Sequence, residues 1–508
     1  MPKLKQPMNL KELCLLRIVN TVRCAYEAWT TALREASRAG SEAYLKETLN
    51  VTADCGNVHD YLTSMSIEVS KHFAPLIINE FISIISVYYG MSYELKRAPW
   101  YDEDAHMNVC SKMLKAVLLN CTTEYDTKNI YFSFVQKIII QTLDCVPELT
   151  TLAFDTRTNM DNSSLLTTNI HHLRNLQHFQ YEYHCTDNVV EQLGLHCTEL
   201  KTINLRESRA VTDASVQHLL KLKKIEYLNL TYTTVSFQAY GSLLSDLPSI
   251  TNIDIMSRIY PLFNLISKEN LYTITEFKGF ISDIYTLTQK CPYVTTVEVY
   301  SLNYDLTILT TLTRLVNLKI MIGNSDSFNL NAVLSGMGER LNELRLSFVE
   351  NVNIAHIVIL CSSLKLLSLE ECTFLPFKEN SIIDKDLPHY RSVTELILLD
   401  NSPHQMYFRH LRHYVNLQHL ECHGVDILTD DFIDETMRQG AFRNILRFCV
   451  LESDVGSLTM RTIELLLQHC EHLTEIGYLK TWSLLSQSQC TELRRRIRSM
   501  NLDVRIYY

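Results

Sequence analysis

The sequence predicts an α/β solenoid, with short parallel strands on one face and helices on the other, preceded by a helical N-terminal region. Three observations lead to this prediction. The chain of 508 residues is longer than a single compact core usually allows. An apolar pattern recurs along most of it, and a second apolar position recurs in register with the first. Hydrophobic residues make up 46% and charged residues 20%, which is typical of a folded chain without long disordered tracts.

The recurrent pattern has the form L-x-x-L-x-L, and its first anchors lie 20 to 29 residues apart. This is the leucine-rich-repeat period, with one strand and one helix in each unit. One unit cannot bury its own apolar face, so units stack and share a continuous core. The last copy has Tyr478 at its third anchor position. The first anchors are Leu149, Leu176, Leu200, Ile225, Ile250, Ile274, Val294, Leu315, Leu341, Leu364, Val393, Leu417, Ile445 and Leu473.

A second regularity is independent of the first. Three residues before each first anchor stands another residue of the buried type, and only Gly338 interrupts the series. We expect the returning helix to close onto the core at this position. Cysteine suits it because a protonated thiol is small and apolar. It occurs there at Cys197, Cys291, Cys361 and Cys470.

Helix starts recur in register as well. Thr212-Asp213 and Thr429-Asp430 each follow the end of a predicted strand at the same distance. A threonine or aspartate side chain there can cap a helix N-terminus. An ordinary α/β domain of alternating strands and helices is the alternative fold, but several features kept in register favour the solenoid.

The two parts of the chain meet at about residue 140. Residues 141–508 form the predicted solenoid of about fourteen repeats, and residues 1–140 lack the repeat and are expected to be helical. We expect Asn9 to cap the first helix. The segment 125–143 is expected to cap the first repeat, as a solenoid requires. The expected helices span about residues 9–30, 74–87 and 107–119.

The repeats resemble a known class. Cys197-x-x-Leu200-x-x-Ile203-x-Leu205, followed by Thr212-Asp213, is similar to the cysteine-containing leucine-rich repeat. That class is best known from substrate-recognition subunits of cullin-type ubiquitin ligases. The resemblance covers about residues 146–508, and only some repeats carry the cysteine. It implies a protein substrate bound on the concave face.

The first predicted helix carries a second resemblance. Leu10, Cys14 and Ile18 are spaced four apart, which places them on one side of a helix. The pattern is similar to the BC-box, the helix that docks receptors onto Elongin C, the partner of Elongin B. A small cysteine lets such a helix lie deep in a groove while the flanking aliphatic residues fill pockets. Asn9 stands where those families usually carry Ser, Thr or Pro.

Families with this box also tend to carry a cullin-selecting segment. Pro75, Ile77 and Phe81 resemble the version used by von Hippel–Lindau-type receptors, although the gap from Cys14 is longer than expected. An F-box adaptor is the close variant, but no Leu-Pro-x-Glu start is present. The alternative for the first helix is plain packing, because any amphipathic helix can place Leu, Cys and Ile on one side. Exposure of Leu10, Cys14 and Ile18 would favour docking, and burial would favour packing.

The concave face is expected to carry the substrate. Residues that alternate with the buried leucines point away from the core, because successive side chains of a strand face opposite sides. The carboxylates among them suit targets that carry lysine or arginine, and the histidines could make binding depend on pH. The candidates are Glu343, Arg345, Glu395, His419, Glu421 and His423.

No catalytic or cofactor motif is present. We find no phosphate-binding glycine loop, no H-E-x-x-H, no paired C-x-x-C and no Gly-x-Ser-x-Gly elbow. The sequence therefore predicts neither an enzyme nor a bound cofactor or metal. The net charge of −10 is spread along the chain without a basic stripe, which argues against nucleic-acid binding. The basic run at residues 494–498 is expected to be the solvated side of a last helix, with a nuclear-import signal as the lesser alternative.

The predicted location is cytoplasmic, with the nucleus as a second possibility. The N-terminal sequence lacks an uninterrupted apolar core of signal-peptide length. The apolar stretch 74–89 contains Asn79 and Glu80 and is too short to span a membrane. The fifteen cysteines are therefore expected to be reduced thiols. Two functions fit these features: a substrate receptor of a cullin–Elongin ubiquitin ligase, and a scaffold outside the ligase system.

Overall fold

The structure is a computed structural model that describes residues 2–6, 10–91, 93–124, 130, 132–155, 157–158, 161–255, 262–266, 271–280, 284–300, 304–375, 390–401, 408–424, 428–451 and 457–507. The chain forms two compact units. The N-terminal unit comprises Met8–Met256 and Tyr260–Glu269, and the C-terminal unit comprises Met1–Pro7, Ser257–Ile259 and Asn270–Tyr508. This division falls within the repeats and not at the predicted boundary near residue 140.

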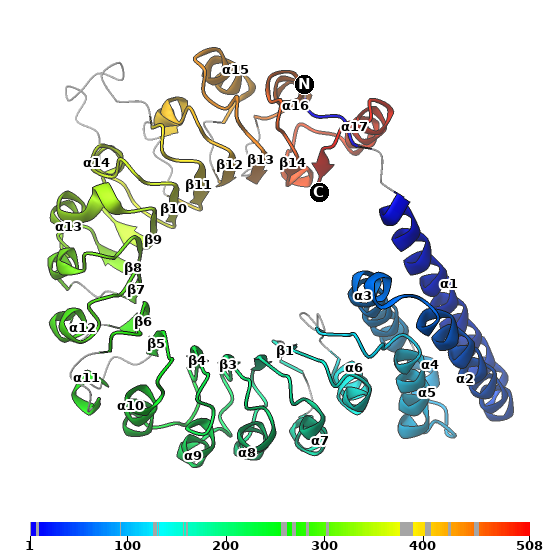
Figure 1. The fold of residues 1–508 in the computed structure, drawn as a ribbon. Coiled ribbons are helices and arrows are strands. Elements are labelled where there is room, and N and C mark those ends of the chain that lie inside the picture. The colour runs from blue at the N-terminus through cyan, green and yellow to red at the C-terminus, as the bar shows by residue number, and fades with distance from the viewer. Residues whose placement is uncertain are drawn as a thin grey trace. The chain divides into compact units, whose positions relative to one another are not determined.

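The N-terminal unit begins with helices, in which α1 packs against α2 and α3, and α2 packs against α5 (Figure 1). Tyr26 is fully buried among them, with its ring edge-on to Trp29 at 5.2 Å and to Phe81 at 5.1 Å. Its hydroxyl donates to the carbonyl oxygen of Met113 at 2.9 Å, so the core satisfies its one polar group. The helices are α1 (Leu10–Ala39), α2 (Ser41–Thr63), α3 (Ile67–Met91), α4 (Tyr93–Lys96), α5 (Glu103–Lys115) and α6 (Ser133–Gln141).

Helix α1 runs past the predicted end at residue 30 and stops at Gly40. The φ of Gly40 is 120°, a conformation that glycine adopts without a steric penalty, and α2 starts at the next residue. The predicted cap Asn9 lies outside the described residues. The predicted helix at 74–87 is the middle of the longer α3, which has the length and hydropathy of a membrane-spanning helix. Its side chains Phe73 and Ile85 are fully buried, as expected for a core helix of the N-terminal unit.

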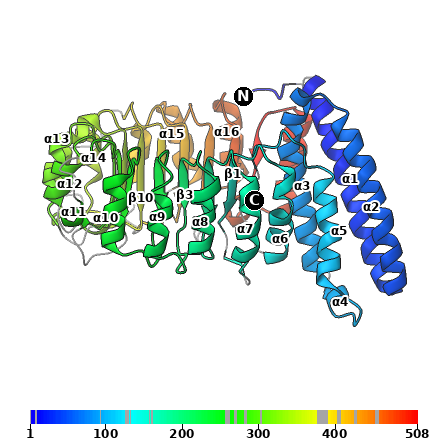
Figure 2. The same ribbon diagram turned by 60° about the horizontal axis from the view of Figure 1, so that its bottom comes forward.

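The repeats of the N-terminal unit follow. Strands β1 to β4 form a parallel sheet in sequence order, and β5 follows β4. Helices α7 to α10 lie side by side (Figure 2). The strands are β1 (Thr151–Phe154), β2 (His178–Tyr181), β3 (Thr202–Asn204), β4 (Tyr227–Asn229) and β5 (Asn252–Ile255). The helical segments are η1 (Leu143–Cys145), α7 (Ser163–Asn169), η2 (Ile170–His172), α8 (Asp187–His196), η3 (Asp213–Ser215), α9 (Val216–Leu219), α10 (Phe237–Asp246) and α11 (Leu262–Leu265).

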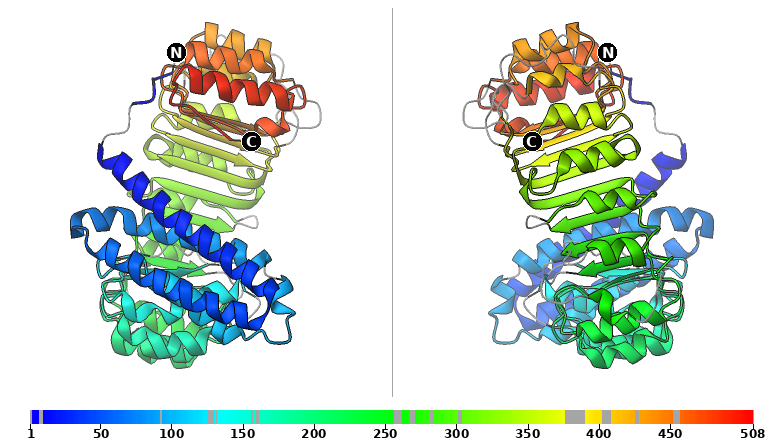
Figure 3. Two further views of the ribbon diagram at one scale, coloured as in Figure 1. Left: turned by 90° about the vertical axis from the view of Figure 1, so that its right-hand side faces the viewer. Right: turned by 90° about the vertical axis from the view of Figure 1, so that its left-hand side faces the viewer.

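The C-terminal unit continues the same architecture, with strands β6 to β15 parallel and in sequence order (Figure 3). The strands are β6 (Glu276–Phe280), β7 (Thr296–Tyr300), β8 (Asn317–Asn324), β9 (Glu343–Glu350), β10 (Leu366–Glu370), β11 (Glu395–Leu399), β12 (His419–His423), β13 (Arg447–Leu451), β14 (Glu475–Gly477) and β15 (Arg505–Ile506). The helical segments are α12 (Ile284–Lys290), η4 (Thr307–Thr311), α13 (Leu330–Met337), η5 (Gly338–Arg340), α14 (Ile354–Leu360), η6 (Phe408–His413), α15 (Asp430–Arg438), α16 (Met460–His469), η7 (Leu479–Thr481) and α17 (Gln487–Ser499).

The first residues of the chain belong to the C-terminal unit, although the sequence placed them with the helical region. Leu4 forms an antiparallel bridge with Leu502. The backbone N–H of Lys5 donates to the carbonyl oxygen of Asn501 at 2.7 Å, and that of Asp503 donates to Lys3 at 2.9 Å. These bonds pair backbone groups of residues 501–503, immediately before the last strand, with the first residues of the chain.

The leucine-rich-repeat solenoid is confirmed. Strands β1 to β14 coincide with the fourteen predicted copies, and the first two anchors of every copy are buried. Among the third anchors whose burial the structure describes, Tyr478 is the one that is not buried: it was expected in the core and is half-exposed. Strand β14 ends at Gly477, Tyr478 adopts φ 64°, and this left-handed turn directs Leu479 into the core in its place.

The position three residues before each first anchor is buried, including Cys197, Cys361 and Cys470. The structure also explains why Gly338 interrupts this series. A Cβ atom at residue 338 would lie 2.5 Å from the carbonyl oxygen of Leu360 and 3.1 Å from Sγ of Cys361. The next repeat therefore fills the space that an apolar side chain would need.

The predicted caps are confirmed as well. Oγ1 of Thr212 accepts a hydrogen bond from the N–H of Ala214 at 3.2 Å, and Oγ1 of Thr429 accepts one from Phe432 at 3.1 Å. The aspartate after Thr429 has a further role. Asp430 accepts hydrogen bonds from the following repeat, so it joins two repeats to each other.

One backbone conformation recurs at the carboxyl end of the strands. The residue two positions after the third anchor has a positive φ in eight of the described repeats, and only one of these residues is glycine. A left-handed conformation costs a residue with a Cβ about 1–2 kcal/mol. It turns the chain at the same place in each repeat. The residues are Tyr183, Glu207, Tyr232, Ile322, Phe348, Glu371, Asp400 and Gly424.

Candidate functional site

The predicted partner residues of the C-terminal unit lie where the alternation placed them. All six are half-buried, on strands β9, β11 and β12, and alternate there with buried anchors. We call them the strand-face set: Glu343, Arg345, Glu395, His419, Glu421 and His423. The strand register places Glu395 beside His419, and Glu343 and Glu395 on either side of Leu366. The set is therefore split between two patches, one on β9 and one on β11 and β12.

The side chains of the strand-face set lie in pairs within the chain. Arg345 forms an ion pair with Glu343 on the same strand. Nδ1 of His419 lies 3.9 Å from Oε2 of Glu395, and Nε2 of His423 lies 3.6 Å from Oε1 of Glu421. These pairs are half-exposed, so a partner could compete for either member.

The sequence missed the neighbours that extend this surface across β13 and β14. The hydroxyl of Tyr478 donates to Oε1 of Glu421 at 3.2 Å, and Arg447 forms an ion pair with Glu475 at 3.2 Å. Burial and the Glu475 carboxylate raise the pKa of the Cys449 thiol to about 12, so this cysteine is protonated at neutral pH. The alternation rule applied to β13 and β14 would have identified Arg447 and Glu475. Tyr478 could not be found, because its left-handed turn reverses the expected side.

The start of α1 is a second candidate. We call residues 10–18 the α1 segment. Leu10 is 78% exposed, Cys14 is exposed and Ile18 is half-buried. The buried residues of the helix begin only at Val22. At about 100° per residue, Cys14 lies roughly 80° and Leu10 roughly 120° around the helix from Val22. The first turns of α1 therefore direct apolar side chains away from the core that the later turns bury.

The cullin-box-like residues lie elsewhere. Pro75 is half-buried within α3, and both Ile77 and Phe81 are fully buried. Phe81 contacts the ring of Tyr26 from α1, so it belongs to the core between the two helices. A partner could not reach Ile77 or Phe81 without opening this core. The burial of these two side chains therefore argues against their expected contact with a cullin.

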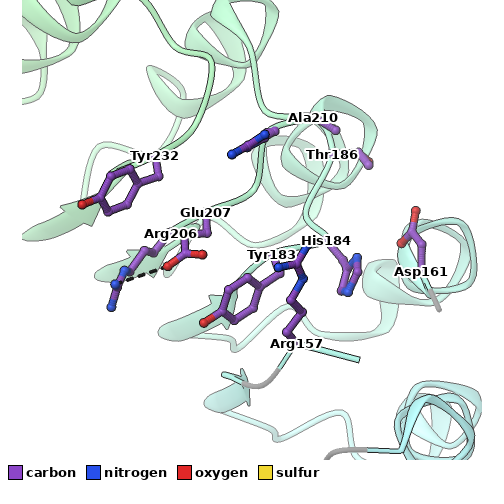
Figure 4. Close-up of a pocket in the computed structure, with 10 residues that line it drawn as sticks. Arg157, Asp161, Tyr183, His184, Thr186, Arg206, Glu207, Ala210 and Tyr232 are labelled. Atoms are coloured by element: carbon purple, nitrogen blue, oxygen red, sulfur yellow. Dashed lines mark ion pairs between the residues drawn. The ribbon is translucent and has the colours of Figure 1, made fainter. Parts of the chain in front are cut away.

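A hollow in the N-terminal unit is the third candidate, and nothing in the sequence pattern pointed to it (Figure 4). We call it the arginine hollow. It has a volume of about 570 Å³ and lies at the carboxyl ends of strands β1 to β4. Three arginines contribute to its lining, and its two tyrosines and its one glutamate all have the left-handed conformation described above. The residues are Arg157, Asp161, Tyr183, His184, Thr186, Arg206, Glu207, Arg209, Ala210 and Tyr232.

The hollow contains three positively charged side chains against two negatively charged ones. Arg206 lies 3.3 Å from Glu207, and its guanidinium lies 6.0 Å from the centre of the Tyr232 ring. Both carboxylate oxygens of Asp161 accept hydrogen bonds from Ser163, at 2.7 and 2.9 Å. No ion pair joins Arg157 or Arg209 to a carboxylate in the part of the chain that the structure describes. The hollow is suited to an anion.

Comparison with known proteins adds the following. No protein-family model and no curated protein matches the chain. An internalin from Listeria monocytogenes matches with 13% identity over 73% of this chain and 92% of the other, with a TM-score of 0.31. The TLR13–ssRNA13 complex matches with 14% identity over 72% of this chain and 65% of the other, with a TM-score of 0.34. The complex of Rad7 and Elc1 in yeast matches with 15% identity over 63% and 75%, with a TM-score of 0.29. By its own pattern of strands, helices and buried anchors, the chain has the leucine-rich-repeat fold with a helical N-terminal region.

Proposed function

We propose that this chain is the substrate-recognition subunit of a cullin ubiquitin ligase, docked on Elongin C and Elongin B through the α1 segment. Its strand face would hold the protein to be ubiquitinated. The observation that carries the proposal is the exposure of Leu10 and Cys14 at the start of a helix whose later turns are buried. An apolar side chain that finds no cover in its own chain is suited to bury itself in a partner.

The pattern of exposure fits helix-in-groove binding. In that mode a helix presents apolar residues spaced three or four apart to a hydrophobic groove. Leu13 is 48% exposed and follows Leu10 by three positions, so these two are neighbours on the helix surface, with Cys14 on the other side of Leu10. Cys14 is the small residue among them, which allows the backbone of α1 to approach the groove closely.

The subunit would act by placement alone. It would raise the effective concentration of a bound substrate near the ubiquitin-charged enzyme and would catalyse no step itself. A cytoplasmic location belongs to the same proposal, since Elongin-based ligases would meet the chain there. Burial of Ile77 and Phe81 leaves the choice of cullin to other surfaces.

The test is reconstitution of the full chain with Elongin B and Elongin C, followed by size-exclusion chromatography. Cys14→Phe places a bulky ring where close approach is needed and should abolish co-elution. Cys24→Phe is the matched control, because Cys24 is also exposed on α1 but lies outside the α1 segment. It should bind like the unmodified chain.

Two results would contradict the proposal. One is an unmodified chain that never co-elutes with Elongin C. The other is equal binding by the Cys14→Phe and Cys24→Phe variants. Affinity purification from cells followed by mass spectrometry, with the same pair of variants, then identifies the cullin. A chain that recovers other proteins but no Elongin or cullin would be a scaffold outside the ligase system.

A further inference from the structure

We propose that the arginine hollow of the N-terminal unit binds a phosphorylated side chain of a protein ligand. This inference goes beyond the ligase proposal and does not depend on it, because the arginine hollow and the α1 segment share no residue. It rests on the charge of the hollow, on its fixed backbone and on the absence of lysine and arginine from the neighbouring strand positions.

The lining of the arginine hollow carries an excess of positive charge. The Glu207 carboxylate is paired with Arg206, and the Asp161 carboxylate is occupied by Ser163. Arg157 and Arg209 line the same hollow and have no carboxylate partner among the described residues. The chain as a whole has a net charge of −10, so the excess of positive charge in the hollow is opposite in sign to the charge of the protein. Such a hollow attracts an anion.

The backbone of the hollow is held in place after β2 and β3 by bonds between repeats. The N–H of Tyr183 donates to the carbonyl oxygen of Arg206 at 3.0 Å, and the N–H of Glu207 donates to Thr231 at 2.8 Å. Beneath them, the hydroxyl of the fully buried Ser208 accepts from the N–H of Cys185 and donates to Tyr181, both at 3.1 Å. Loops fixed in this way lose little conformational entropy when a ligand binds.

The chemistry of the lining favours a phosphoryl group over a carboxylate. A phosphorylated side chain carries about −1.5 to −2 charges and three acceptor oxygens at neutral pH. Arg157 and Arg209 can supply two guanidinium groups, each able to donate two parallel hydrogen bonds. The volume of about 570 Å³ exceeds that of a phosphoryl group alone. The rings of Tyr183 and Tyr232 therefore remain for the peptide residues on either side of the phosphate.

A nucleic acid is disfavoured by the surroundings. A strand of nucleic acid would need a basic track that follows successive phosphates. The strand positions next to the hollow that alternate with the apolar anchors contain neither lysine nor arginine. They are Thr151, Ala153, His178, Gln180, Thr202, Asn204, Tyr227 and Asn229. One isolated anionic group fits this surface better than a chain of them.

The test uses the purified full-length chain and fluorescence polarisation. The probes are three labelled peptide pools of random flanking sequence, centred on phosphoserine, phosphothreonine or phosphotyrosine, with the matching unphosphorylated pools. At least one phosphorylated pool should bind, and its unphosphorylated counterpart should not. Arg157→Gln and Arg209→Gln should each weaken binding on the order of tenfold. Arg174→Gln is the control, because Arg174 is an exposed arginine of the same unit outside the hollow.

Four outcomes would overturn the proposal. The phosphorylated pools do not bind, or they bind no better than the unphosphorylated ones. Arg174→Gln weakens binding as much as Arg157→Gln and Arg209→Gln do. Inorganic phosphate displaces the peptide at concentrations equal to those of the peptide itself, which would make this a site for the free anion. A labelled single-stranded DNA binds with the same dependence on Arg157 and Arg209, which would make it a nucleic-acid site.

Discussion

Replacing Asp430 by alanine tests how the repeats of the C-terminal unit are joined. The Asp430 carboxylate accepts three hydrogen bonds from the next repeat: from the N–H of Thr459 at 3.0 Å, from its hydroxyl at 2.6 Å and from the hydroxyl of Thr462 at 2.6 Å. A hydrogen bond to a charged group contributes about 1.5–3 kcal/mol, and Thr462 is fully buried, so its hydroxyl would lose its partner. Thr459 and residue 430 are half-exposed, so water can replace part of the hydrogen bonding that Thr459 loses. We expect Asp430→Ala to lower the free energy of unfolding of this unit by about 3 kcal/mol.

The same contacts predict a pH dependence. Partial burial alone would raise the pKa of the Asp430 carboxyl, but the hydrogen bonds from Thr459 and Thr462 outweigh it and hold the pKa below its usual value. A carboxyl with a lowered pKa in the folded state contributes stability above the pKa of the unfolded chain, about 3.9. That contribution is lost as the pH falls through the lowered pKa. The difference in the free energy of unfolding between the Asp430→Ala variant and the unmodified chain should therefore be largest at pH 7 and become smaller in acid.

The assay is urea unfolding of the full chain, followed by circular dichroism at pH 7 and at several lower pH values. Asp431→Ala is the matched control. Its carboxylate is on the same helix, and the side chain is 86% exposed and paired with Arg461 at 2.7 Å. An exposed ion pair contributes at most about 1 kcal/mol. The reasoning is refuted if Asp430→Ala costs no more than Asp431→Ala, or if its cost does not fall in acid.

Three further predictions follow from burial and exposure. Cys197 should react with iodoacetamide far more slowly than Cys14 in the folded protein, because Cys197 is fully buried and burial raises its pKa to about 12; equal rates by mass spectrometry would contradict this. Replacing both Glu395 and Glu421 by lysine should weaken the binding of a protein captured on the strand face and leave thermal unfolding unchanged. If only substitutions on the helix face affect capture, the assignment of the binding surface to the strand face is wrong. Leu10→Ala should cost about 0.5 kcal/mol, well below the 2–5 kcal/mol of a buried leucine, since Leu10 is 78% exposed; a cost in the buried range by thermal unfolding would place Leu10 in the core.

Much of the solenoid could be predicted from the sequence, because the residues that determine each strand lie within that strand's own segment. The spacing of apolar anchors decides which residues form a strand and which of its sides is buried, so β1 to β14 and the buried cysteines at Cys197, Cys361 and Cys470 were found. The same alternation placed Glu395 and Glu421 on the strand face. The prediction that Tyr478 is buried was wrong because the backbone is left-handed at this anchor position. The apolar spacing does not reveal such a conformation. The α1 pattern was found as well, but sequence alone could not say whether Leu10 and Cys14 were exposed.

Other features depend on which residues become neighbours once the repeats stack. Gly338 is required by the carbonyl oxygen of Leu360, 22 positions later, and Asp430 binds Thr459 in the following repeat. Burial of Ile77 and Phe81 depends on where α3 meets α1. The arginine hollow combines residues from successive repeats, including Arg157 and Arg209. Periodicity determines the side of a strand to which a residue belongs, because this is a property of one segment. The contacts between repeats are properties of the packed molecule, and only the tertiary structure decided them.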